Sequence, residues 1–270
     1  MPEVTRTCRK NRRESKVSVN EAIKEVQDII IKTGARGCIT GSSMIPGEDF
    51  SLWDEVPDVD LFVYTKPQLQ DIAKELELLH GFKPMNDANA WKWDRMRHED
   101  DNYKTNLMTL KMKAPNGIVA NISWKKGKTN IADVLASFDM TIIMVGYDIP
   151  NRFYLDLRTA VPGAVVDPEG RWSPSIKVAV PNPMRRQDVD MYGTAMWARQ
   201  FNRVIKYWNR GYDTRPMARF YIEKITKVID TGKLFDTDNG EQAFNEFVEE
   251  FEPERARMIE WLRDKEDTCD

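Results

Sequence analysis

The sequence predicts a mixed α/β protein, in which a sheet flanked by helices is followed by a helical C-terminal lobe. Helix and strand patterns alternate between residues 18 and 150, as they do in layered α/β folds. Beyond about residue 180 the apolar periodicity is helical only. We therefore expect a basic flexible tail at 1–17, an α/β domain at 18–180 and a helical domain at 181–270.

Local signals set most of the predicted elements. Ser18 and Glu21 form a capping box at the start of the first helix, Pro67 and Gly81 mark the two ends of the second, and Asn116-Gly117 is a strong hairpin signal. Strands are predicted at 36–40, 58–65, 105–112, 118–124 and 138–147, and helices at 18–34, 66–80, 129–137, 185–210 and 216–232, with two acidic helices within 240–264.

Two further segments are predicted from their composition. The apolar run 138–147 is long enough for a central strand. Residues 84–104 are polar and aromatic, so we expect them to lie outside the sheet, and the prolines between 150 and 183 indicate an irregular connection.

Composition excludes several classes of function. The formal net charge of -3 gives no overall argument for a polyanionic partner. Cys8, Cys38 and Cys269 are far apart in the sequence and favour a reducing cytoplasm. No apolar run is long enough to span a membrane, so we expect no membrane partner. With only His80 and His98, chemistry has to rest on carboxylates, lysines, arginines or metals.

The strongest chemical signal is the pair Asp58 and Asp60 at the start of an apolar strand. Residues i and i+2 of a strand point to the same face about 6.6 Å apart, so both carboxylates can bind one hard cation. Mg²⁺ prefers oxygen ligands and usually keeps positions for water and substrate phosphates. Gly41, Ser42 and Ser43 precede the pair and offer backbone N–H groups and a hydroxyl to a triphosphate. The alternative is a solvated acidic pair at a strand end.

The segment ITGSSMIPGEDFSLWDEVPDVDLFV resembles the DNA polymerase beta-like nucleotidyltransferase superfamily, whose signature is a helix, a short strand, Gly-Ser, a loop and then DxD. The resemblance covers roughly residues 18–150 and would suit a viral or phage protein, hence a host cytoplasm. It implies that 18–180 is the catalytic domain, and that two Mg²⁺ or Mn²⁺ ions are held by three carboxylates.

The third carboxylate position is open between two residues. Asp139 begins an apolar segment and, being charged there, needs a compensating partner such as a metal, so it is the favoured ligand. Asn121 in IVANIS is the other candidate and, being neutral, would weaken the second metal site. The resemblance implies that Asp58, Asp60 and Asp139 are catalytic metal ligands, one of which can receive the proton of the attacking hydroxyl.

A cationic stripe recurs at helical spacing in the predicted helix 185–210. Arg199, Arg203, Lys206 and Arg210 lie three or four residues apart and form one cationic stripe. Such a stripe can hold a triphosphate or, through Arg199 and Arg210, a nucleic-acid backbone; the alternative is a solvated helix face. The segment RVIKYWNRGY resembles a pattern of relatives with a helical second lobe, which implies that Arg203 and Lys206 contact phosphate. Tyr207 either stacks on the base or belongs to the core.

Three basic segments predict contacts with single-stranded nucleic acid. They are the N-terminal tail, Arg95 and Arg97 beside Trp91 and Trp93, and Lys125, Lys126 and Lys128. The alternative is that the tail is only disordered and that the tryptophans form only a surface cluster.

Together these features predict transfer of a nucleotide, such as AMP from ATP, to a hydroxyl acceptor. The basic patches favour an RNA 3′ end, tRNA-like or otherwise, whereas the superfamily also allows protein or small-molecule acceptors. Two rival hypotheses are a catalytically inactive module that binds nucleotide, nucleic acid or a partner, and an assembly protein in which DxD is incidental. The oligomeric state stays open.

Overall fold

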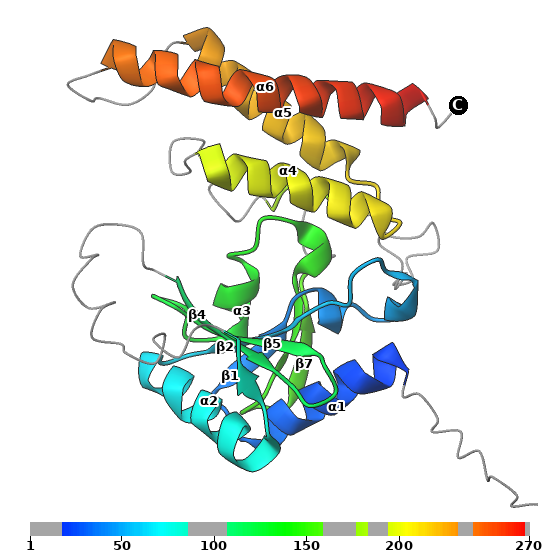
Figure 1. Cartoon of the computed structure of the whole chain (residues 1–270), viewed down its shortest axis with the longest axis vertical. Helices are drawn as coiled ribbons and strands as arrows, with labels where there is room; N and C mark the ends of the chain where they lie inside the picture. Colours follow the sequence, from blue (N-terminus) through cyan, green and yellow to red (C-terminus); the bar gives the residue numbers. More distant parts are fainter. Residues whose placement is uncertain (1–17, 86–106, 159–176, 183–193, 232–239, 268–270) are drawn as a thin grey trace, which may run out of the picture.

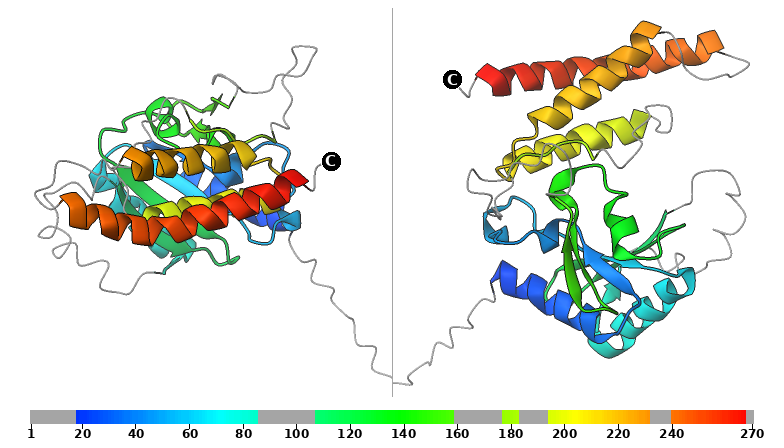
Figure 2. Two further views of the ribbon diagram at one scale, coloured as in Figure 1. Left: turned by 90° about the horizontal axis from the view of Figure 1, so that it is seen from above. Right: turned by 180° about the vertical axis from the view of Figure 1, so that it is seen from behind.

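The computed structural model describes residues 18–85, 107–158, 177–182, 194–231 and 240–267. Figure 1 shows the sheet with α1 (Val19–Lys32) and α2 (Lys66–His80) on one face, and α4 (Thr194–Asn209), α5 (Arg215–Thr231) and α6 (Gly240–Asp267) stacked beyond the other. The views from above and behind in Figure 2 show the same layering. The predicted fold class, a mixed sheet flanked by helices and followed by helices, is confirmed.

The sheet has seven strands in the order β3-β4-β5-β2-β1-β6-β7. Only β2 and β5 pair in parallel, and all other neighbouring strands are antiparallel. The strands are β1 (Gly37–Thr40), β2 (Val59–Val63), β3 (Lys83–Pro84), β4 (Leu107–Lys113), β5 (Val119–Lys125), β6 (Val145–Asp148) and β7 (Phe153–Asp156).

The helices are α1 (Val19–Lys32), α2 (Lys66–His80), α3 (Ile131–Leu135), α4 (Thr194–Asn209), α5 (Arg215–Thr231) and α6 (Gly240–Asp267). The predicted capping box is present, since Ser18 and Glu21 bond each other's backbone N–H groups. Gly81 ends α2 with φ 69°, a left-handed conformation that favours glycine. Short 3₁₀ turns occupy Ser42–Met44, Phe50–Leu52 and Thr141–Ile143.

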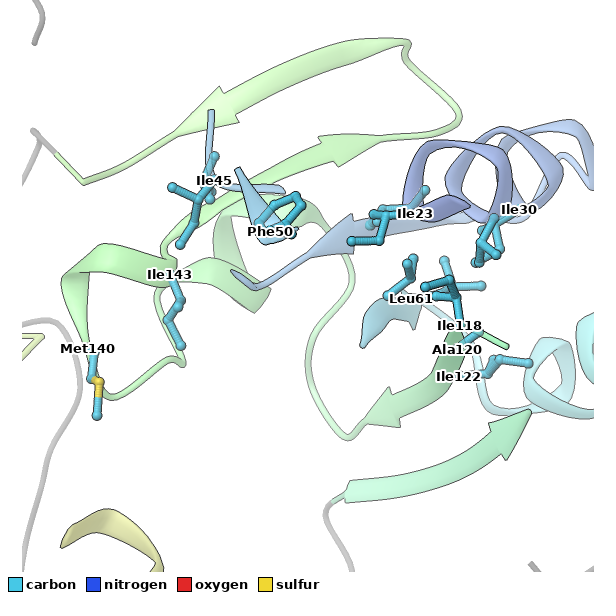
Figure 3. Close-up of a cluster of buried hydrophobic side chains, with 14 of the residues drawn as sticks. Ile23, Ile30, Ile45, Phe50, Leu61, Ile118, Ala120, Ile122, Met140 and Ile143 are labelled. Carbon is cyan, nitrogen blue, oxygen red and sulfur yellow. The ribbon is translucent and has the colours of Figure 1, made fainter. Parts of the chain in front are cut away.

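The core lies between the sheet and helices α1 and α2. Ile23 and Ile30 of α1 point at Leu61 and Ile122 of the central strands, as Figure 3 shows. Along β2 the valines and Leu61 are buried on this face, so the alternate residues Asp60 and Phe62 lie on the other. The hydrophobic core thereby turns Asp60 toward the helical lobe.

The predicted strand at 138–147 is wrong in length and position. Residues 141–143 form a 3₁₀ turn, and the strand β6 is confined to Val145–Asp148, between β1 and β7 rather than at the centre. The run is apolar because Met140 to Val145 are buried where the sheet meets 177–182, with Met140 bridging to Pro181. Burial from several sides, not strand geometry, explains the pattern.

Two other predictions need correction. Residues 153–156, expected to be irregular, form the edge strand β7, which pairs with β6 through a turn containing Arg152 at φ 54°. The two acidic helices expected within 240–264 are one helix, α6, with Pro253 inside it. Pro253 has no backbone N–H, so α6 lacks one helical hydrogen bond there. Packing of α6 along α5 and against α4 stabilises the helix despite this loss.

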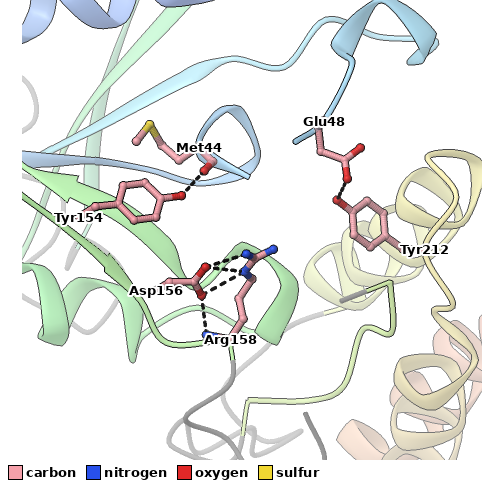
Figure 4. Close-up of polar contacts among 6 residues, drawn as sticks. All are labelled: Met44, Glu48, Tyr154, Asp156, Arg158 and Tyr212. Atoms are coloured by element: carbon pink, nitrogen blue, oxygen red, sulfur yellow. Dashed lines mark hydrogen bonds and ion pairs between the residues drawn. The ribbon is translucent and has the colours of Figure 1, made fainter. Parts of the chain in front are cut away.

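Glu48, in the loop between β1 and β2, links the two layers. Its carboxylate Oε1 accepts hydrogen bonds from Tyr212 Oη at 2.8 Å and from Lys177 Nζ at 2.5 Å, and Figure 4 shows the Tyr212 contact. Asn20 of α1 fixes the same loop by bonding Glu48 O and Phe50 N–H. The loop is therefore held between α1 and the start of α5.

No helix among the described residues is long and apolar enough to cross a membrane. The division of the chain at 180 stays a prediction. Residues 177–182 contact both parts: Val178 bridges to Asp213 beside α5, and Asn182 N–H bonds Asp139 O next to the sheet.

Candidate active site

Asp58 and Asp60 meet at one point at the start of β2. The side-chain amide Nδ2 of Asn121 donates to Asp58 Oδ2 at 3.0 Å and to Asp60 Oδ1 at 2.8 Å. One donor atom thus touches both carboxylates, as the i, i+2 spacing predicts. A position within reach of both oxygens is a position for a cation.

Strand register explains why Asn121 is the residue beside the pair. In the parallel pair of β2 and β5, Asp60 stands opposite Asn121, so their side chains share a face. On the other side of β2, Thr40 of β1 stands opposite Asp60. Asn121, one of the two candidates for the third ligand position, therefore lies on the strand directly beside Asp60.

Burial raises the pKa of Asp60 to about 6, because little water reaches its carboxylate. The hydrogen bond from Asn121 lowers that pKa, the neighbouring Asp58 raises it, and the charges of Arg203 and Lys206 lower it. The carboxylate thus lies where a positive charge is needed, within the fields of two cations from α4.

Gly41 leaves room for this carboxylate. Its φ of 83° with ψ of -161° is a conformation that is essentially restricted to glycine. A Cβ at this position would lie 2.6 Å from Asp60 Oδ2, which is closer than atoms can approach. The glycine therefore brings the backbone of the Gly-Ser turn against the acidic pair.

The two serines after Gly41 have different surroundings. Ser43 is buried and its Oγ has no hydrogen-bond partner among the described residues, while its carbonyl accepts from Gln27 Nε2 at 2.9 Å. The Ser42 side chain lies near the Tyr207 hydroxyl and lowers its pKa, against the larger effect of burial, which raises it. The structure thus places Gly41, Ser42 and Ser43 beside the acidic pair, with one hydroxyl still able to donate.

Two cations of α4, and Arg210 directly after it, contact residues of the α/β part of the chain. Arg203 Nη1 pairs with Asp139 Oδ2 at 2.7 Å, and Lys206 Nζ pairs with Glu55 Oε2 at 3.0 Å. The guanidinium of Arg210 is buried and stacks 4.0 Å above the ring of Trp53. Arg203, Lys206 and Arg210 thus contact segments next to the sheet, while the Lys206 side chain stays exposed.

Tyr207 lies in the core, which is one of the two alternatives for this residue. Its side chain is 5% exposed and meets Tyr212 edge to face at 5.9 Å. Burial raises the pKa of its hydroxyl. The ring supports the position of α4 above the Gly-Ser turn.

The remaining predicted contacts are placed only in part. Lys125 ends β5 and Lys126 follows it, exposed, in the turn after the strand. The backbone of Arg199 belongs to α4, but its side chain lies outside what the structure describes. The N-terminal tail, Arg95 and Arg97 also lie outside the described residues.

The residues at the acidic pair fit one divalent cation. Among the described residues no three histidine, cysteine or acidic side chains converge as metal ligands. The amide oxygen of Asn121, however, is buried and has no described hydrogen-bond partner, and a half-turn of the amide would exchange it with Nδ2. Asp58, Asp60 and Asn121 then present three oxygens, the ligand type that Mg²⁺ prefers.

Asp139 lies on a different element from this group. It follows α3 and is buried, and its carboxylate pairs with Arg203. The charge in an apolar segment, which favoured a metal partner, has an arginine partner in the structure. Its role as a third ligand stays a prediction.

A pocket of about 300 Å³ opens beside Lys206. It lies between α4 and the loop before β2 and is lined by Asp54, Glu55, Asn202, Ile205, Lys206, Asn209 and Arg210. Sequence reasoning did not single out Asn202 or Asn209. Both lie three or four residues from Lys206, so the helical spacing that revealed the cations would have found them too.

The fold and the site define a mixed α/β protein with a two-carboxylate cation position facing a helical lobe. No family model matches the sequence. No curated protein matches it either.

Solved structures with a similar arrangement include two CCA-adding enzymes, which belong to the nucleotidyltransferase superfamily. One is a complex of a CCA-adding enzyme with CTP, at a TM-score of 0.46 and 12% identity over 91% of this chain and 55% of that chain. The other is the Thermotoga maritima CCA-adding enzyme complexed with tRNA, at 0.44 and 12% over 91% and 54%. This chain spans about half the length of either enzyme.

Proposed function

We propose that the chain is a nucleotidyltransferase that binds a nucleoside triphosphate with Mg²⁺ or Mn²⁺ between the sheet and α4, and transfers its nucleotidyl group to a hydroxyl. The observation that carries this proposal is the convergence of Asp58 and Asp60 on one point, with the backbone of Gly41 against Asp60. Two carboxylates beside a glycine turn suit a cation that is shared with phosphates.

Asp58 and Asp60 would hold the cation, and Asn121 would add its amide oxygen. When bound, the cation supplies neutralisation of phosphate charge and lowers the pKa of the attacking hydroxyl. One carboxylate of the pair receives the proton that the hydroxyl loses. The acceptor hydroxyl then bonds to the α-phosphorus and pyrophosphate leaves.

Arg203 and Lys206 would bind the triphosphate. Each is paired with one carboxylate, Asp139 and Glu55, and both side chains are at least one-third exposed. A triphosphate brings several anionic oxygens and can share or displace these partners. The unpaired hydroxyl of Ser43 is a further donor beside the glycine turn.

We propose an RNA 3′ end as the acceptor, on the basis of the lysines that follow β5. Lys126 is exposed at the end of the strand that carries Asn121. A protein or a small molecule with a free hydroxyl is the alternative acceptor, because the fold does not fix this choice.

A second candidate function is a nucleotide-binding module without transferase activity. It is favoured by the register of β5, which puts the neutral Asn121 beside Asp60. With two carboxylates instead of three, one cation can still bind with a triphosphate, whereas a second cation has fewer ligands. On this reading the protein binds nucleotide, nucleic acid or a partner.

The deciding experiment incubates pure protein with Mg²⁺ or Mn²⁺, each of the four labelled triphosphates, and total RNA or a protein extract. The variant Asp58→Ala/Asp60→Ala is the test, and Asp71→Ala on the outer face of α2 is the control. Label transferred by the wild type and the control but not by the double variant supports the transferase. Metal-dependent triphosphate binding without transfer supports the binding module, and the absence of both overturns each.

A further inference from the structure

A row of side chains crosses the sheet from the acidic pair toward its β3 edge. Asp60 on β2 stands opposite Asn121 on β5, and Asn121 stands opposite Lys111 on β4. Residues directly opposite each other share a face, so Lys111 lies on the same face as Asp60. Two strand spacings separate them, which is about 10 Å.

Three exposed lysines gather at the end of this row. Lys113 lies two residues after Lys111 on β4 and therefore on the same face, and Lys83 on β3 stands directly opposite Lys113. On the other face of β4, Leu110 and Met112 are buried beneath the helices. The three lysines form a patch, which we call the β3–β4 lysine patch.

Within the part of the chain that the structure describes, no ion pair compensates the positive charge of the patch. None of the three ammonium groups has a carboxylate within 4.0 Å among the described residues. Like charges directly opposite each other on neighbouring strands destabilise a sheet. An anion with several charges, spread over the patch, would relieve this repulsion.

Charge around the acidic pair is divided between two sides. On the side of the pocket, Asp54 and Glu55 are exposed at the rim. These two acids face Lys206 and Arg210 across the pocket, so the charge on that side is balanced. On β4, the described side chains that are exposed on the same face as Asp60 are Lys111 and Lys113. A polyanion that reaches Asp58 and Asp60 therefore meets its uncompensated attraction over β4.

We propose that the β3–β4 lysine patch binds the phosphate backbone of a single-stranded RNA whose 3′ end lies at Asp58 and Asp60. The inference rests on the proposed function for the position of the 3′ end, whereas the binding itself can be measured without transfer. The lysine ammonium groups act as point charges on successive phosphates, and the contact carries no base preference.

Lys83→Ala/Lys111→Ala/Lys113→Ala tests the proposal. The matched control is Lys24→Ala/Lys32→Ala/Lys74→Ala, which removes the same charge from exposed positions on α1 and α2, across the sheet. Binding of a fluorescein-labelled single-stranded RNA of about 12 nucleotides is followed by anisotropy at several salt concentrations. Each lost phosphate contact reduces the slope of log K against log salt by about 0.7, so the patch variant should lose about 2.

The expected result is a loss of slope and of RNA affinity in the patch variant only, with unchanged melting temperatures and unchanged metal–triphosphate binding in both variants. Equal losses in the two variants, or an unchanged slope in the patch variant, overturn the proposal. A wild-type protein that transfers nucleotide to another acceptor and binds no RNA overturns this proposal alone. RNA binding through the patch without any transfer overturns the transferase and leaves the patch.

Discussion

Asn121 donates its side-chain amide to Asp60 from the position directly opposite it on the parallel neighbour strand, at 2.8 Å. The amide also reaches Asp58, so one neutral group neutralises part of the repulsion between two carboxylates. This relationship puts Asn121 in contact with both carboxylates of the proposed cation site, and it leads to the first prediction.

Asn121→Asp should destabilise the metal-free protein and strengthen its binding of Mn²⁺. The change removes two hydrogen bonds to charged groups and adds a third carboxylate, which we expect to cost about 2–4 kcal/mol of unfolding free energy. Saturating Mn²⁺ should recover most of this loss, since bound ligand stabilises the folded state. Urea denaturation and calorimetric Mn²⁺ titration measure the two effects. Asn130→Asp, at the N-cap of α3, adds the same charge elsewhere and should change neither quantity appreciably.

Gly41→Ala should damage both stability and cation binding. The backbone conformation alone costs about 1–3 kcal/mol for a residue with a side chain. In addition, the new methyl group would displace the Asp60 carboxylate, which lies 2.6 Å from the Cβ position. We expect Mn²⁺ affinity to fall at least about tenfold because the ligand is misplaced.

Gly127→Ala separates the two effects of the Gly41 change. Gly127 also has a positive φ, 74°, but a Cβ there meets nothing within 4 Å. It should lose stability through backbone strain and keep its Mn²⁺ affinity. If both glycine variants bind Mn²⁺ like the wild type, Gly41 does not position the Asp60 carboxylate.

The pH dependence of Mn²⁺ binding should report Asp60. Because the pKa of Asp60 is raised to about 6, the cation must displace a proton below that pH, and the dissociation constant should rise about tenfold per pH unit. Above pH 6 the dissociation constant for Mn²⁺ should hardly change with pH. Calorimetry between pH 5 and 8 measures the profile, and Asp60→Asn should remove its slope.

The stability of the metal-free protein should change with pH in the opposite direction to Mn²⁺ affinity. The pKa of Asp60 in the folded protein exceeds the ordinary aspartic acid value of 3.8, so the folded state holds the proton more tightly than the unfolded state. Stability contributed by protonated Asp60 is present below pH 3.8 and is lost as the pH rises to about 6. A stability difference between wild type and Asp60→Asn that does not change across this range would contradict the raised pKa.

Elements with local signals were predictable from the sequence, and their spatial neighbours were not. Ser18, Gly81 and Asn116-Gly117 act on the backbone within a few residues, so the ends of α1 and α2 and the β4–β5 hairpin were found. The pairing of β2 with β5, which puts Asn121 beside Asp60, joins residues some sixty positions apart. No local pattern encodes that pairing, and Asn121 and Asp139 therefore stayed alternatives.

The Arg203–Asp139 ion pair was not predicted for the same reason, because it joins residues far apart in the sequence. Helical spacing showed that Arg203, Lys206 and Arg210 share a face, but not what the face meets. In the structure the face meets Asp139, Glu55 and Trp53, which belong to segments far away in the sequence.

Asp139 and Arg203 should be energetically coupled. The Asp139 side chain is 3% exposed, so Arg203→Gln leaves a buried carboxylate without its ion pair and should cost about 3 kcal/mol of unfolding free energy. Asp139→Asn removes the charge, and the double variant should be more stable than the sum of the single changes by about 1–3 kcal/mol. Urea denaturation of the four proteins measures this coupling, and additive changes would show that the pair does not stabilise the fold. Mn²⁺ titration of Asp139→Asn tests the ligand role separately: a ligand role lowers the affinity at least about tenfold, whereas pairing alone leaves it unchanged.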